Sequence, residues 1–151
     1  MRNKFILFGF GILLLSSCGN QSTETTQQEE QETTHEEKQE STPALHLNNG
    51  EKWTVNAETH IGMNHLQGIV DSLPDSIDFP AIAAKMETET QYIISNCDMT
   101  GEDHNQLHLV LHPILDGIRN MKEGANGEEG QKGLNTVQKN LEDYFTHFQT
   151  Q

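Results

Sequence analysis

The sequence predicts an all-α domain, an up-down-up-down antiparallel four-helix bundle that follows a disordered N-terminal tether. Two observations support this fold class. Apolar residues recur with helical spacing in four separate segments. Glycines and prolines interrupt the pattern between these segments, and the breaks are short, so sequential helices should pack side by side and antiparallel. No segment shows the sustained alternation of a strand, so no sheet is expected.

The first two helices are each predicted from one apolar face and from their ends. The first should begin after an N-cap at Asn56 and end at Leu73, because Pro74 cannot continue a helix. The second should begin near Pro80, which suits a first helical turn, and continue to Cys97.

The last two helices carry the clearest patterns. Leucine, isoleucine, valine and methionine recur at helical spacing over residues 107–121, and an apolar stripe that ends in aromatic residues covers residues 134–148. Pro113 lies inside the third pattern, so that helix should either bend there or break and restart.

The start of the chain is typical of an export signal. A basic leader precedes an apolar run of 11 residues, which is too short to cross a bilayer. The run ends in Leu-Ser-Ser-Cys, which resembles the lipobox of bacterial lipoproteins. This resemblance implies cleavage after residue 17 and lipidation of Cys18, which would anchor the protein to a membrane. Gly19 stands where many lipoproteins of the inner membrane have Asp, which favours the outer membrane, facing the periplasm or the cell surface.

The next segment is predicted to be a disordered tether. Residues 18–43 combine the lipidated cysteine with an acidic stretch of seven Glu, six Thr and five Gln, and that stretch has no aliphatic or aromatic residue. Residues 44–151 remain for the folded domain. The whole chain has a net charge of −14, which repels phosphate backbones, so nucleic-acid binding is not expected.

The predicted topology brings chemically active residues to one end of the bundle. The start of the first helix, the end of the second, the start of the third and the end of the fourth should meet there. These places carry the following imidazole and sulfur side chains: His60, Met63, His65, Cys97, Met99, His104, His108, His112 and His147. Imidazole and sulfur ligands that converge from several helices suit a transition metal.

Four of these residues form the best predicted site. Cys97 and Met99 precede the third helix, and His104 and His108 lie one turn apart on it. Soft sulfur ligands favour copper, and zinc is the alternative. The remaining histidines and Met63 are additional candidates. Each residue also has a purely structural interpretation, as a buried hydrophobe, a gap-filling methionine or a boundary histidine.

Haem is a less favoured cofactor. The expected architecture resembles cytochrome b562, in which an early methionine and a late histidine bind a non-covalent haem, and Met63 and His147 lie in roughly those places. The sequence has no C-x-x-C-H motif for covalent attachment.

A longer pattern resembles a group of small exported bacterial proteins. Residues 47–56 match L-N-x-G-x-K-W-x-x-N, and residues 97–113 match C-x-M-x-G-x-x-H-x-x-L-H-x-x-L-H-P. The resemblance spans roughly residues 45–149 and implies a helical protein of largely uncharacterised activity. The predicted metal site rests on the residues themselves.

The sequence predicts a binding protein and not an enzyme. It has no nucleophile elbow, no H-E-x-x-H motif and no phosphate-binding glycine loop. We expect a lipid-anchored cell-envelope protein that binds copper or, less favoured, zinc. The alternative is a metal-free module that docks onto another envelope protein through His112, Trp53 and its acidic faces.

Overall fold

The computed structural model describes residues 43–124 and 127–150, and this part of the chain is mostly helical. The predicted signal peptide, the lipidation of Cys18 and the tether as far as residue 42 lie outside the described residues. The described residues belong to one compact unit that spans residues 40–151.

Four helices confirm the all-α prediction. They are α1 (Ala57–Asp71), α2 (Phe79–Asn96), α3 (Glu102–Glu123) and α4 (Gly127–His147). The last two begin before their predicted apolar faces, because their first turns are polar. Each of those first turns contains two acidic residues, which suit the positive end of a helix dipole.

A small parallel sheet corrects the expectation that the fold has none. β1 (Trp53–Val55) precedes α1, and β2 (Phe148–Thr150) follows α4, with Trp53 paired to Phe148. Three residues are too few to show an alternating pattern in the sequence. Phe148 also continues the apolar stripe of α4, so its spacing alone indicates a helix.

The starts of α1 and α2 differ in how their backbone groups are satisfied. The Asp78 side chain accepts a hydrogen bond of 3.1 Å from the Ala81 N–H, so it caps α2. Asn56 occupies the predicted N-cap position of α1 but makes no capping bond. Its Nδ2 instead donates to the Asn96 carbonyl at 2.8 Å, which joins the start of α1 to the end of α2.

Pro113 lies inside one continuous helix. α3 runs from Glu102 to Glu123 through the proline, so the helix does not break and restart. The residues on either side of it that face inward, Leu111 and Ile114, are buried. One continuous helix therefore carries every residue from His104 to Glu123.

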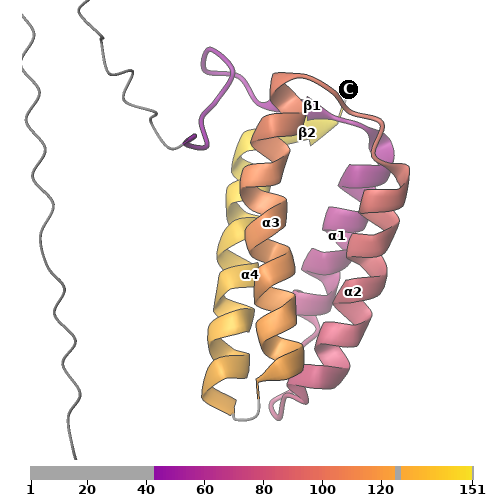
Figure 1. Cartoon of the computed structure of the whole chain (residues 1–151), viewed down its shortest axis with the longest axis vertical. Coiled ribbons are helices and arrows are strands. Elements are labelled where there is room, and N and C mark those ends of the chain that lie inside the picture. Colours follow the sequence, from indigo (N-terminus) through magenta and orange to yellow (C-terminus); the bar gives the residue numbers. More distant parts are fainter. Residues whose placement is uncertain (1–42, 125–126, 151) are drawn as a thin grey trace, which may run out of the picture. The chain divides into compact units, whose positions relative to one another are not determined.

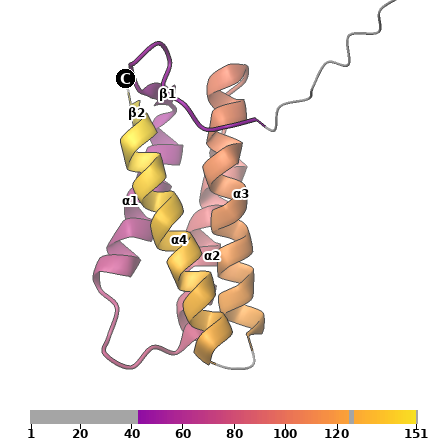
Figure 2. The ribbon, with the colours of Figure 1, turned by 90° about the vertical axis from the view of Figure 1, so that its left-hand side faces the viewer.

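Neighbouring helices make contacts in reverse order along their lengths. Asn56 meets Asn96 and Gly62 packs on Ile93, so α1 and α2 run in opposite directions. The helices lie alongside one another, with both strands and the α2–α3 connection at one end (Figure 1). The view turned by 90° also places the two strands together at that end (Figure 2). This arrangement is compatible with a four-helix bundle.

The core runs between all four helices and reaches the sheet. Its largest fully buried side chains include Tyr144 and Met63. Trp53 of β1 also belongs to the core, at the end that carries the strands. Within residues 43–124 and 127–150, no helix combines the length and the apolar character needed to cross a membrane.

Candidate functional site

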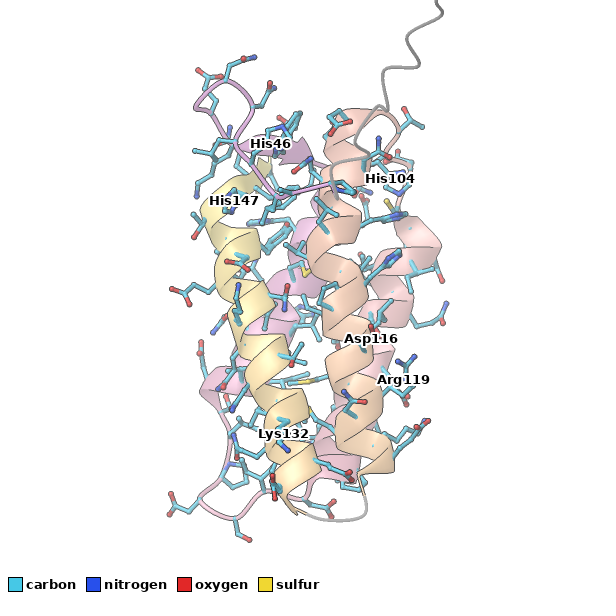
Figure 3. The ribbon with its side chains drawn as sticks, turned by 60° about the vertical axis from the view of Figure 1, so that its left-hand side comes forward. His46, His104, Asp116, Arg119, Lys132 and His147 are labelled. Carbon is cyan, nitrogen blue, oxygen red and sulfur yellow. The ribbon has the colours of Figure 1, made fainter. Side chains whose placement is uncertain are left out.

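The end of the molecule that carries the strands also carries most of the candidate residues. We call it the strand-bearing end. His60 at the start of α1 contacts Tyr144 near the end of α4, so the start of the first helix and the end of the fourth lie together as predicted. His46, His104 and His147 all lie toward this end, away from Lys132 (Figure 3). The predicted gathering of histidines is therefore present in outline.

Three histidines of α3 form a continuous row, which we call the histidine row. His104, His108 and His112 follow one another at intervals of four residues, so each lies one turn from the next. The ring centroids of His104 and His108 are 4.4 Å apart, and those of His108 and His112 are 4.7 Å apart. His104 and His108 are half-buried, whereas His112 is exposed.

The middle ring of the row is electrostatically distinct. Burial lowers the pKa of His108 below its usual range, and the positive charge of His104 and then of His112 lowers the same pKa further. A neutral imidazole has a lone pair with which to bind a metal, and a protonated one does not. The row therefore presents a metal-binding form of His108 at neutral pH.

The register of α2 and α3 places the segment Cys97–Gly101 along this part of α3. An ion pair of 2.8 Å joins Lys122 to Glu87, and Leu115 shares a groove with Ile94. By this register, α3 rises roughly 16 Å beyond the end of α2, at 1.5 Å per residue. Five extended residues at about 3.3 Å each just cover that rise, so the segment runs beside the first three turns of α3.

Cys97 and Met99 lie on that segment but turn toward the core. Cys97 carries a free thiol, and both side chains are half-buried and pack against the hydrophobic cluster. Met99 lines a groove of about 380 Å³ that Asn56 and Asp103 also line. Among the described residues, no three or more His, Cys, Asp or Glu side chains are gathered closely enough to hold a metal ion. The structure therefore brings His104 and His108 together but does not assemble the four predicted ligands into a closed site.

The additional candidate ligands have other partners. The Met63 side chain is fully buried in the core. His60 Nδ1 lies 3.0 Å from the Tyr144 hydroxyl, and His65, near the middle of α1, lies 2.8 Å from a Glu89 carboxylate oxygen. These residues lie outside the histidine row, and the purely structural interpretation fits Met63 best.

His147 stands apart from the row as well. Its Nδ1 lies 2.8 Å from the Asp143 carbonyl oxygen of its own helix. Met63 and His147 therefore have core and helical contacts of their own, and neither of these contacts indicates a haem crevice.

Residues 45–53 make a strap across the strand-bearing end that sequence reasoning missed. The His46 N–H donates to Gln106 Oε1 at 3.1 Å, and the Trp53 indole N–H donates to the His46 carbonyl. Gln106 is only 2% exposed, and Trp53 is also buried. Trp53 is therefore a core residue and is not available as the docking side chain that the alternative function required. A polar residue within a helical pattern gives no signal of such a contact.

Two further polar residues at this end, Tyr144 and Asn56, have surroundings that the sequence pattern does not predict. Burial raises the pKa of Tyr144 far above its usual range, so the phenol stays neutral beside His60. The Asn56 Oδ1 atom is buried without a hydrogen-bond partner. Both features depend on tertiary packing, which the periodicity of the sequence does not reveal.

No known protein family matches the chain, and neither a curated protein nor a solved structure is similar enough to match it. The chemistry of the site is therefore argued from this chain's own residues.

Proposed function

We propose that this chain is a lipid-anchored protein of the bacterial cell envelope that binds a transition metal ion, copper in preference to zinc. The binding site would lie at the strand-bearing end of an up-down-up-down four-helix bundle. One observation carries the proposal: His104 and His108 hold their ring centroids 4.4 Å apart on a single rigid helix, at the edge of the core.

Two imidazoles one turn apart are a common way for a helix to hold a metal ion. Each ring needs to present one nitrogen at about 2 Å from the ion, and neighbours at positions i and i+4 can do this together. Because α3 fixes both backbones, little conformational freedom is lost on binding. The lowered pKa of His108 supports the same role, since its neutral form is the one that binds.

The sulfur atoms of Cys97 and Met99 would complete the site. Both residues lie on the extended segment that runs beside the first turns of α3, and both are half-buried. Their side chains would have to turn from the core toward the histidine row when the ion binds. Thiolate and thioether are soft ligands, which is why copper is favoured over zinc.

The proposed location rests on the chain's first residues. The apolar run and the lipobox that ends in Cys18 support export and lipidation, and the acidic tether after it would hold the domain away from the lipid surface. Gly19 after the cysteine favours the outer membrane.

The test is metal retention by residues 40–151, the compact unit that contains every described core residue. Reduced protein would be loaded anaerobically with Cu(I) or with Zn²⁺, washed with a competing chelator and measured by elemental analysis. We expect about one copper per chain and less zinc. The double variant Cys97→Ala, His104→Ala should lose tight copper binding.

The matched control is the double variant His65→Ala, His147→Ala, which removes two imidazoles that lie outside the row. It should retain copper like the original protein. If the Cys97→Ala, His104→Ala variant retained as much copper as the original protein, the proposed ligands would be wrong. Loss of copper in the control alone would place the site elsewhere on the molecule.

A metal-free docking module is the second candidate, and one observation favours it. Ile94 is 49% exposed and lines a groove between α2 and α3 with Leu115, so a large apolar side chain is open to a partner beside the polar residues of that groove. Thermal unfolding with and without a chelator separates the candidates. A resident metal raises the midpoint by mass action, whereas a docking module does not respond to the chelator.

A further inference from the structure

We propose that the histidine row is a transfer path in which an ion binds first between His108 and His112 and then moves to His104 and His108. This inference rests on the metal-binding function proposed above and adds the route by which the ion arrives. His108 would be a ligand in both positions, so the ion would never leave the protein during the transfer.

The geometry of the row allows two positions for an ion and forbids one shared by all three rings. Adjacent ring centroids are 4.4 Å and 4.7 Å apart, so neighbouring rings are close enough to bind one ion when each turns a nitrogen toward it. The stacked rings of His108 and His112 must rotate to do this, because the lone pairs lie in the ring planes. His104 and His112 are eight residues apart, or about 12 Å along the helix axis, so they cannot bind one ion together. An ion on the row must therefore bind a pair, and His108 belongs to both pairs.

Exposure along the row sets the direction of transfer. His112 is exposed and meets an ion that arrives from solvent, whereas His104 and His108 are half-buried. The extended segment with Cys97 and Met99 runs beside these turns of α3, so the sulfur ligands proposed above would join the half-buried pair when their side chains turn from the core. The ion is therefore captured where water reaches it and retained where the soft ligands lie.

The transfer needs only ligand exchange. A lone pair of His104 forms a bond to the ion while the bond from His112 breaks, and His108 stays bound throughout. The oxidation state of the ion does not change, and no proton or co-reactant is consumed when the imidazoles are neutral. The rings meet edge to face at one step, with an interplanar angle of 64°, and stack at the other, with an angle of 28°.

Two other histidines, His60 and His65, have partners outside the row. The nearest ring neighbours of His108 are His104 and His112. His65 lies beside Glu89, and His60 lies beside Tyr144. The exposed ring next to the half-buried pair is therefore His112, the histidine that sequence reasoning ranked as an additional candidate.

The test compares the rate of copper loading with the amount retained. Residues 40–151 would be mixed anaerobically with Cu(I) bound to a coloured bidentate chelator, and the loss of colour would be followed by stopped-flow absorbance. The variants are His112→Ala and His108→Ala, with His65→Ala as the matched control on α1. Alanine is the best helix former, and His112 is exposed, so the fold should be kept.

We expect His112→Ala to retain as much copper as the original protein but to load it about tenfold more slowly, since the half-buried pair must then meet the ion directly. His108→Ala should lose both rate and retention, and His65→Ala should change neither. Loading of His112→Ala at the original rate would overturn the transfer path and leave the metal site intact. Loss of retention in His112→Ala equal to that in His108→Ala would make His112 a permanent ligand and would also overturn it.

A failure of the underlying function has a different signature. If the original protein retains no Cu(I), the metal site and the path are both wrong, whatever the variants do. If the original protein retains copper and only the His112 rate is unchanged, the site stands and the path is wrong.

Discussion

The two ends of the helical domain are built on different principles. At the far end, α3 and α4 approach so closely that Gly117 and Gly133 face each other's backbone, and Phe79 at the start of α2 lies against Gly130. At the strand-bearing end, contacts run through polar side chains such as His60, Asn56 and Gln106. At the end opposite the strands, an added Cβ at Gly117, Gly130 or Gly133 would lie within 3 Å of a neighbouring atom. The strand-bearing end instead has histidines with partial solvent access.

This contrast would suit a domain that carries the metal site proposed above. Close backbone packing gives stability that does not depend on any functional group, so the side chains of the other end are free to serve binding. The histidine row begins at the strand-bearing end and reaches the middle of α3, where His112 is exposed. We therefore expect substitutions at the glycines to change stability and substitutions in the row to change binding.

The largest predicted effect is that of Gly133→Ala. A Cβ atom at this position would lie 2.5 Å from the Gly117 carbonyl oxygen and 2.9 Å from the Met121 backbone nitrogen. Because these atoms are backbone, the helices must separate, which should cost about 2–3 kcal/mol in the free energy of unfolding. Urea unfolding followed by circular dichroism measures this loss.

The matched control is Gly68→Ala on α1, where an added Cβ meets nothing within 4 Å. Alanine favours the helix, so this change should stabilise the domain by about 0.5–1 kcal/mol. Equal destabilisation by both substitutions would mean that close packing does not distinguish the two sites.

The next effect belongs to the strand-bearing end. Tyr144→Phe removes the hydroxyl that lies 3.0 Å from His60 Nδ1 and should cost about 1 kcal/mol at neutral pH. Burial raises the pKa of Tyr144 in the folded state, so the unfolded chain ionises first, near pH 10. The contribution of Tyr144 is therefore complete below that pH and is lost as the pH rises above it. Unfolding measured at pH 7 and pH 11 should show the difference between the two proteins shrinking.

Much of the fold could be predicted from the sequence, because helices with one buried face leave a long periodic signal. The four helices and the direction of their neighbours follow from that signal and from short connections. The strands β1 and β2 could not be predicted, since three residues carry no measurable alternation. The exact first residues of α3 and α4 could not be derived from the periodicity, because their first turns are polar and have no apolar face.

The candidate site, like the fold, could be predicted from the sequence only in part. Spacing alone places His104 and His108 one turn apart, and the structure confirms that their rings meet. The orientation of Cys97 and Met99 could not be derived, because they lie on a connection whose path depends on how far α3 extends beyond α2. Local pattern predicted the neighbouring histidines that one helix carries, and tertiary packing determined where Cys97 and Met99 lie.

A smaller effect is expected in acid for His108→Gln. Burial and the neighbouring histidine charges lower the pKa of His108 in the folded state, whereas the unfolded chain binds a proton near the ordinary value of about 6.5. The folded state therefore binds fewer protons, and stability falls as the pH drops below that value. Because His108 is partly exposed, the loss should stay below about 1 kcal/mol.

The measurement is the free energy of unfolding of the metal-free protein between pH 8 and pH 5. His108→Gln should reduce its slope, and His112→Gln should reduce it less, because it removes only one neighbouring charge. An unchanged slope in His108→Gln would show that burial and the neighbouring histidines do not lower the pKa of His108 in the folded state.

The smallest effect is expected for the surface charges that link α2 and α3. Lys122 Nζ lies 2.8 Å from Glu87 Oε2, and the side chains are 52% and 42% exposed, so solvent and salt screen the pair. A double-mutant cycle with Lys122→Ala and Glu87→Ala should give a coupling below about 0.5 kcal/mol that decreases further in salt. A coupling comparable to the cost of Gly133→Ala would overturn the view that backbone packing holds this end together. A small coupling would mean that the glycine contacts, and not the ion pair, determine how tightly the helices pack at this end. The ion pair would then only reflect the register of α2 and α3, which places Cys97–Gly101 beside the histidine row.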